Sequence, residues 1–172
     1  MGTGKSSLGT RLARKLDRPF ADLDTIIEEE AGKSIPEIFE QEGEEGFRAH
    51  ERKQLLKTIR EYEGILALGG GALHNQHLVD HIKINGLLIF IETPFSVILD
   101  RILQHNNRPL LLNDDGTMKD RETLENELQE LYDQRLKYYQ QSEITIHTDN
   151  RSSIEDTAAA LVSKIRNHVS YN

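Results

Sequence analysis

A glycine-rich loop at the start of the chain runs directly into a helical pattern. The loop matches the second half of the Walker A pattern, and leucines at every fourth position predict a helix over residues 8–16. Backbone N–H groups at such a helix N-terminus can bind phosphate, Lys5 can reach a β or γ phosphate, and Ser6 can bind Mg²⁺. A plain glycine turn with an unrelated lysine is the alternative. The loop residues are Gly2, Thr3, Gly4, Lys5, Ser6 and Ser7.

The front half of the Walker A pattern is not contained in the sequence. The full pattern has another glycine five positions before Gly4 and a buried strand before that glycine, so both would precede Met1. In P-loop folds this strand is usually central in the sheet, and without it two neighbouring strands would have unpaired edges. We therefore expect Met1 to be an internal methionine of a longer natural product.

Apolar runs alternate with helical patterns along the rest of the chain. Strands are predicted over residues 19–24, 65–68, 86–91 and 143–147, the middle two buried on both faces. Helices are predicted over residues 25–31, 47–62, 75–84, 95–103, 122–141 and 154–169, with another beginning near Ser34. The alternation predicts a single α/β domain over residues 1–172, with a parallel sheet of the P-loop NTPase type flanked by helices.

Composition and charge exclude several classes of function. The 172 residues are 37% hydrophobic, and no apolar run approaches the roughly 20 residues that span a bilayer, so no membrane partner is expected. The absence of cysteine rules out disulfide and thiolate chemistry and agrees with a cytoplasmic location. A net charge of −8 without a basic patch argues against a nucleic-acid partner.

Two aspartates occupy alternate positions at the end of the first predicted strand. Asp22 and Asp24 would then point to one face and serve one site. One can support Mg²⁺ through water, while the other orients an attacking hydroxyl or accepts its proton. Solvent-exposed acids or helix caps explain the same pattern equally well.

An arginine–glutamate pair and a glycine triplet form two further signals. Arg48 and Glu51 are three residues apart on a predicted helix and would share a face, with an ordinary surface ion pair as the alternative. Three glycines, at 69–71, close the predicted strand at 65–68. They predict a backbone that a ligand approaches closely, with a flexible turn as the alternative.

The polar segment 104–121 is expected to form a mobile lid. It contains Arg108, followed by Pro109 and two leucines, and Arg135 lies on the next predicted helix. A lid arginine over the phosphates would stabilise the charge of a transferring group and exclude water.

In this order, the motifs resemble the shikimate kinase family. The resemblance covers the chain from Met1 to about Arg151 and depends on GTGKSS, DLD, GEEGFRAHE, LGGGA, RPLL and the R-x-x-x-Y of 135–139. The chain departs from the family pattern in its absent first strand and first Walker glycine. It also departs at Lys137, where many members carry proline.

The resemblance implies the roles of the residues around the phosphates. Lys5 and the loop backbone would hold the phosphates of ATP, and Lys5 would act in catalysis. Ser6 would bind Mg²⁺, and Asp22 would support it through water. Arg108 would be a catalytic lid residue on ATP, and the adenine contact would fall near Arg151.

The resemblance also implies how shikimate would bind. Asp24 would hydrogen-bond the shikimate hydroxyls and act as the base. Arg48 and Arg135 would hold the carboxylate, where paired guanidinium groups supply geometry as well as charge. Gly70 and Gly71 would offer backbone contacts to the ring and the γ-phosphate. Residues 25–62 would form the substrate-binding region.

The implied activity is transfer of the ATP γ-phosphate to the 3-hydroxyl of shikimate, giving shikimate 3-phosphate and ADP in the chorismate pathway to aromatic amino acids. A five-stranded parallel sheet and a monomer are implied as well.

Two alternatives stay open. One is a binding or regulatory protein without turnover, favoured by the absent strand, and the other is a P-loop kinase for gluconate or a nucleotide.

Overall fold

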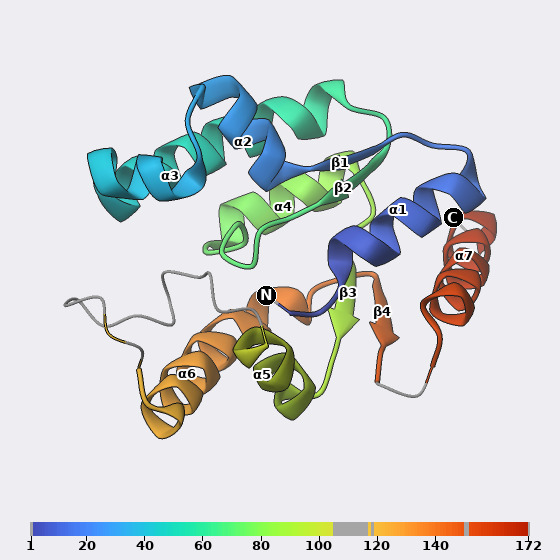
Figure 1. The fold of residues 1–172 in the computed structure, drawn as a ribbon. Helices are drawn as coiled ribbons and strands as arrows, with labels where there is room; N and C mark the ends of the chain where they lie inside the picture. Colours follow the sequence, from blue (N-terminus) through green and yellow to red (C-terminus); the bar gives the residue numbers. More distant parts are fainter. Residues whose placement is uncertain (1, 105–116, 118, 150–151, 172) are drawn as a thin grey trace.

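A computed structural model describes residues 2–104, 117, 119–149 and 152–171. Within these residues, four short strands alternate with seven helices (Figure 1). The strands are β1 (Phe20–Asp22), β2 (Ile65–Ala67), β3 (Ile89–Glu92) and β4 (Ile144–His147). The helices are α1 (Lys5–Leu16), α2 (Leu23–Ala31), α3 (Ile35–Glu61), α4 (Gln76–Asn85), α5 (Phe95–Leu103), α6 (Arg121–Tyr139) and α7 (Ile154–Tyr171).

The strands form two separate parallel pairs rather than the single five-stranded sheet that the resemblance implied. β1 pairs with β2 in the register Phe20↔Ile65, and β3 pairs with β4 in the register Ile89↔Ile144. The predicted α/β class with parallel strands is confirmed. The unpaired edges are also as predicted, because β2 and β3 each have a ladder partner on one side only among the described residues.

The prediction that residues 65–68 and 86–91 form fully buried strands is wrong. Most residues of β2 and all residues of β3 are only partly buried. Among the residues that the structure describes, each strand has a neighbouring strand on one edge only, so the opposite edge has no ladder partner there.

Helix α1 joins the glycine loop to the C-terminal half of the fold. Its apolar residues pack with β4 and α7, which lies beside α1 in Figure 1. Gly9 allows the close approach of β1, because a Cβ there would lie 2.6 Å from Cε2 of Phe20. The buried members of this cluster are Leu8, Leu12, Ile144, Ile146, Ala158, Leu161 and Val162.

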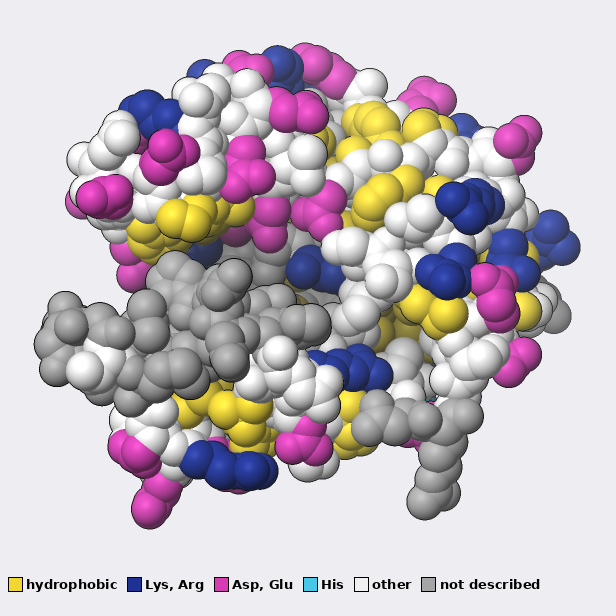
Figure 2. Space-filling model, viewed as in Figure 1, with side chains coloured by type: hydrophobic (Ala, Val, Ile, Leu, Met, Phe, Trp, Pro, Cys, Tyr) yellow, Lys and Arg dark blue, Asp and Glu magenta, His cyan; other side chains and the backbone are white. Residues whose placement is uncertain are grey.

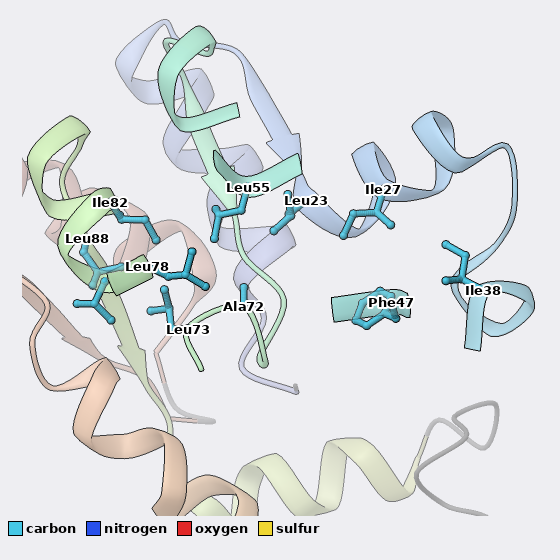
Figure 3. Packing of buried hydrophobic residues seen from close by; sticks show 11 residues of the cluster. Leu23, Ile27, Ile38, Phe47, Leu55, Ala72, Leu73, Leu78, Ile82 and Leu88 are labelled. Carbon is cyan, nitrogen blue, oxygen red and sulfur yellow. The ribbon is translucent and has the colours of Figure 1, made fainter. Parts of the chain in front are cut away.

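Helices α2 and α3 form the region beside the predicted substrate site. Ser34 and Glu37 form a reciprocal capping box at the start of α3, which confirms the predicted helix start. Gly43, at φ 71°, interrupts the helical backbone of α3 and separates two helical parts, consistent with the two predicted helices. Figure 3 shows the core beneath them, where Leu23 and Ile27 of α2 and Leu55 of α3 lie in the same cluster as side chains of α4.

A third cluster joins α5 to α6, with Ile98, Leu99 and Ile102 against Leu124 and Leu128. Asp120 caps α6 by accepting a hydrogen bond from the N–H of Thr123. Most of the predicted lid between these helices lies outside the described residues.

Candidate active site

The glycine loop presents the N-terminus of α1 to the interior of the site. Gly2 and Gly4 have φ values of 69° and 80°, a left-handed conformation that suits glycine. Gly4 is the N-cap of α1, and no described side chain caps the helix there. The first-turn N–H groups and the positive end of the helix dipole therefore suit an anion, with Lys5 in the same turn.

Arg101 holds the loop in position from α5. Its Nη1 donates a 2.9 Å hydrogen bond to the carbonyl oxygen of Gly2. A Cβ on Gly2 would lie 3.1 Å from the carbonyl oxygen of Ile98, so the loop lies close against this helix. The sequence reasoning missed Arg101, and no local signal reveals it, since the two partners are 99 residues apart.

Ser6 and Asp22 meet at the start of the loop helix. The Ser6 hydroxyl donates a 2.7 Å hydrogen bond to Oδ2 of Asp22. Oδ1 of Asp22 accepts from the N–H of Asp24 at 3.1 Å, which caps α2. A hydroxyl and a carboxylate are the oxygen donors that Mg²⁺ binds beside phosphates, so these residues fit the predicted metal.

The two aspartates do not alternate on a strand as predicted. β1 ends at Asp22, and Asp24 lies in the first turn of α2. The helix-cap alternative is therefore correct for Asp22. Burial raises the pKa of Asp24, and the neighbouring Asp22 carboxylate adds to this rise while Lys5 opposes it.

Arg48 is held between two glutamates of α3. Its Nη1 lies 2.6 Å from Oε2 of Glu51, and its Nη2 lies 3.2 Å from Oε1 of Glu44. Glu51 is only 1% exposed, so the alternative of an ordinary surface pair is wrong. Glu44 was missed, although its spacing of four residues from Arg48 is a signal for an ion pair on a helix.

The glycine triplet contacts these charged side chains directly. A Cβ on Gly69 would lie 2.9 Å from Oδ1 of Asp24 and 3.1 Å from Oε1 of Glu51. A Cβ on Gly71 would overlap the guanidinium of Arg48. A side chain at Gly69 or Gly71 would therefore displace the ends of Asp24, Glu51 or Arg48 from their places, which agrees with the predicted close approach to this backbone.

Helix α6 contacts the glycine triplet through Tyr139. The hydroxyl of Tyr139 donates a hydrogen bond to the carbonyl oxygen of Gly70. Burial raises the pKa of Tyr139, and Arg135, one turn earlier on α6, opposes that rise. The sequence pattern included Tyr139 but assigned it no role.

A cavity of about 350 Å³ is lined by Thr3 and Lys5 of the glycine loop, by Gly69 and Gly70 of the triplet, and by Arg135. Its lining does not include the other predicted site residues that the structure describes, among them Asp24 and Arg48. Figure 2 shows a hollow in this face, with Lys or Arg side chains inside it and acidic side chains along its upper rim. Arg108 and Arg151, predicted to contact ATP, lie outside the described residues.

The parallel strands, the phosphate-binding helix N-terminus with its lysine, and the neighbouring carboxylates define an α/β phosphotransferase of the P-loop class. A family profile described as shikimate kinase matches residues 1–166. The chain belongs to the shikimate kinase family, and it is an ATP-dependent kinase of aromatic amino acid biosynthesis.

Individual relatives agree with this assignment. The chain is 33% identical over 168 residues to the shikimate kinase of Chlorobium chlorochromatii, covering 98% of this chain and 88% of that protein. It is 40% identical over 151 residues to the shikimate kinase of Rhodococcus jostii, covering 88% and 85%. The structure of the Acinetobacter baumannii shikimate kinase in complex with shikimate is similar, with a TM-score of 0.85 and 34% identity, covering 98% and 89%.

In the described part of the chain, no helix is both long and apolar enough to cross a membrane.

Proposed function

We propose that the chain transfers the γ-phosphate of ATP to the 3-hydroxyl of shikimate, giving shikimate 3-phosphate and ADP. The observation that supports this most is the shared cavity in which Lys5, at the N-terminus of α1, lies with Gly69, Gly70 and Arg135. The phosphate-binding helix end and the glycine triplet that approaches Asp24, Glu51 and Arg48 are thereby adjacent, as in-line transfer between two bound molecules requires.

The loop and Lys5 would bind the β and γ phosphates of ATP. The free N–H groups of α1 point positive charge at the phosphate oxygens, and the Lys5 ammonium neutralises charge as the β–γ bridging bond breaks. The other residues of the phosphate-binding loop would be Gly2, Thr3, Gly4, Ser6 and Ser7. The predicted ATP contacts of Arg108 and Arg151 are supported by the family resemblance alone.

Mg²⁺ would be held by the Ser6 hydroxyl, with Asp22 supporting it through water. The ion would neutralise the charge on the phosphate oxygens when it is bound. The Ser6 hydroxyl already lies 2.7 Å from Oδ2 of Asp22, so a metal ion on Ser6 would have this carboxylate within reach of its bound water.

Asp24 would act on the attacking hydroxyl. Its carboxylate accepts the proton of the 3-hydroxyl as the hydroxyl oxygen bonds to the γ-phosphorus and ADP leaves with the electrons of the broken bond. Its raised pKa makes this carboxylate a stronger base than an exposed aspartate.

Arg48 and Arg135 would bind the carboxylate of shikimate. Arg48 is preoriented by Glu51 and Glu44, and its guanidinium lies over the ring of Phe47, 5.2 Å from the centroid. A fixed guanidinium loses little freedom on binding a carboxylate, which favours affinity and orientation. Gly70 and Gly71 would supply backbone contacts beside it.

An ADP-release assay with Mg²⁺, ATP and shikimate tests this proposal. We expect release to depend on shikimate and to yield one shikimate 3-phosphate per ADP, whereas gluconate and nucleoside monophosphates give no more ADP than ATP alone. K5A should lower kcat, since it removes the phosphate-neutralising charge, and K15A on the exposed face of the same helix is the control. Saturable shikimate binding with no turnover would instead favour the binding-protein alternative.

The remaining parts of the proposal are a monomer and a cytoplasmic location. The resemblance supports the monomer, and the cysteine-free composition agrees with a reducing compartment. Light scattering of the purified chain tests the first, and cell fractionation tests the second.

A further inference from the structure

Helix α3 consists of two helical parts that meet at Gly43. This residue has φ 71° and ψ −174°, a backbone conformation that interrupts the helix and that is almost restricted to glycine. We call residues 35–42 the front part and residues 44–61 the rear part. The rear part carries Arg48, whereas the front part carries no residue to which a role has been assigned above. The contacts between the two parts are therefore the means by which the front part can affect the site.

Two phenylalanines form the apolar contact between the two parts. The ring of Phe39 in the front part stacks on the ring of Phe47 in the rear part, with centroids 4.7 Å apart and planes inclined by 29°. Phe47 lies in the same buried cluster as Ile38 of the front part (Figure 3). The guanidinium of Arg48 lies over the ring of Phe47, 5.2 Å from its centroid. Phe47 therefore contacts both the front part and the arginine proposed to bind shikimate.

Glu42, the last residue of the front part, forms the polar contact across the break. Its Oε2 lies 3.0 Å from Nε2 of His50 in the rear part, and its Oε1 accepts a 3.2 Å hydrogen bond from Nζ of Lys33. Gly46 leaves room for this side chain, because a Cβ there would overlap Cβ of Glu42 and lie 3.2 Å from its Oε2. We call Lys33, Glu42 and His50 the clasp. Each of its side chains is only about one-third exposed.

We propose that the clasp is a positioning device for the shikimate carboxylate, and that protonation of His50 tightens it. Glu42 holds the front part in the place where Phe39 supports Phe47. The arginine above that ring is thereby oriented before substrate arrives, which favours affinity. The inference rests on the proposed function, in which Arg48 binds the carboxylate. The clasp residues act through Phe47 and Arg48, so they are positioning residues.

The imidazole makes the clasp dependent on pH. Hydrogen bonds from Lys33 and His50 lower the pKa of the Glu42 carboxyl, so Glu42 is ionised near neutral pH. Imidazole groups change charge between about pH 5 and 8, and a protonated ring adds charge attraction to its hydrogen bond. The clasp is therefore tightest while His50 carries a proton, and it weakens as the pH rises and this proton is lost.

Other charged groups of the surrounding elements are separate from this contact. Several side chains of α2 and of the rear part have partners of their own: Glu28, Glu30, Glu44, Arg48, Glu51 and Lys57. None of these is a histidine. Two further groups near the predicted shikimate site titrate independently of the clasp. They are Asp24, with its raised pKa, and His74, whose Nδ1 lies 3.3 Å from the carbonyl oxygen of Gly71.

Calorimetric titration of the full chain with shikimate, without ATP, tests the proposal. The Kd is measured at about pH 6 and about pH 8, on either side of the range in which imidazole loses its proton. We expect the Kd of the parent to rise roughly threefold between them, the size of effect expected for a partly exposed ion pair. H50Q should have the higher Kd at both values, and H50R, with a permanent charge, the lower one. H77Q, at an exposed histidine of α4, is the control and should behave as the parent.

The partner of the imidazole is tested in the same way. E42Q should have a Kd at least as high as that of H50Q, and the double variant E42Q/H50Q should bind no more weakly than E42Q, since both changes remove one contact. In the ADP-release assay the KM for shikimate should follow the Kd, while kcat stays within about twofold of the parent. A pH dependence that persists in H50Q would assign it to Asp24 or His74 and overturn the proposal.

Hydrogen exchange at the amides of residues 38–42 gives a readout that does not involve shikimate. After correction for the intrinsic pH dependence, exchange in H50Q and E42Q should be roughly threefold faster than in the parent at about pH 6. Unchanged exchange in both variants would overturn the clasp. Faster exchange with an unchanged Kd would overturn its role in positioning Arg48. A parent that binds no shikimate would contradict the proposed function, whereas equal Kd values in a parent and variants that all bind would overturn the positioning role alone.

Discussion

Tyr139 on α6 donates its hydroxyl hydrogen to the carbonyl oxygen of Gly70, which lies 69 residues earlier in the chain. The bond connects the helix that carries Arg135 to the glycine triplet that contacts Arg48 and Asp24. The side chains proposed to bind the carboxylate and the hydroxyls of shikimate are therefore linked through one part-buried hydroxyl.

Replacing Tyr139 with phenylalanine should loosen this connection. Y139F leaves the Gly70 carbonyl without its donor, and we expect a loss of about 1–3 kcal/mol in the free energy of unfolding. The KM for shikimate should rise more than the KM for ATP, because the substrate side of the cavity is affected. Y138F removes the neighbouring hydroxyl and is the control. Equal effects of the two variants on KM would show that the bond does not position the site.

Glu51 should be required for Arg48 to bind carboxylate. E51Q keeps the shape of the side chain but removes the charge that orients the guanidinium at 2.6 Å. We expect the KM for shikimate to rise roughly tenfold, in proportion to a lost charge-assisted hydrogen bond. Steady-state kinetics at saturating ATP measures the change.

E44Q is the matched control for this experiment, since it removes the exposed partner of the same arginine. Exposed pairs contribute only about 0–1 kcal/mol, so E44Q should leave KM within a few-fold of the parent value. An E44Q effect as large as that of E51Q would contradict the importance of the buried carboxylate.

Alanine at Gly71 should displace Arg48 without straining the backbone. The new Cβ would overlap the guanidinium, so the arginine must leave its place beside Glu51. We expect a higher KM for shikimate, by roughly one to two orders of magnitude, with the KM for ATP nearly unchanged. G86A is the control, because its Cβ would meet its nearest neighbour only at 3.7 Å. A G71A enzyme with unchanged KM would place Arg48 outside the binding site.

Asparagine at Asp24 should lower turnover and stabilise the fold at neutral pH. Burial holds the pKa of Asp24 above its ordinary value of 3.8, so the ionised carboxylate destabilises the folded state. The favourable contribution of its protonated form is fully present below 3.8 and is lost as pH rises through the raised pKa. D24N should therefore unfold at higher urea concentration than the parent at pH 7, and the difference should shrink toward pH 4. Turnover should fall by about 10²–10⁴.

The control for this prediction is E29Q, which changes the same charge at an exposed position on α2. It should alter neither turnover nor the pH dependence of unfolding. In the parent enzyme, kcat/KM should decline toward acid as Asp24 takes up a proton, beginning at a higher pH than for an exposed aspartate. A D24N variant that retains full turnover would exclude this residue as the base.

The elements that local patterns describe were predicted closely. Helix α5 has the predicted bounds, α3 begins after the predicted cap Ser34, and α4 lies within one residue of the predicted range 75–84. These signals lie within a few residues of the helix ends, so no tertiary context is needed to read them. The predicted burial of β2 and β3 was wrong because the burial of a strand depends on which strands lie beside it, and local sequence does not reveal these neighbours.

Much of the candidate site also follows from local motifs, but its contacts do not. The glycine loop, Asp24 and Arg48 were identified from the sequence, whereas the bond from Arg101 to Gly2 and that from Tyr139 to Gly70 join distant segments. The prediction that Asp22 and Asp24 alternate on one strand was wrong, because α2 begins at Leu23, two residues earlier than the predicted helix. The helix turn then brought the second carboxylate inward.

The two carboxylate oxygens of Asp22 accept different hydrogen bonds. Oδ1 caps α2 through the N–H of Asp24, and Oδ2 accepts from the hydroxyl of Ser6. Exchange of the Ser6 bond for a metal-bound water would occupy only Oδ2 and leave the cap intact. The helix that carries Asp24 can therefore stay in place through each cycle of nucleotide entry and departure, so the base need not be repositioned for every turnover.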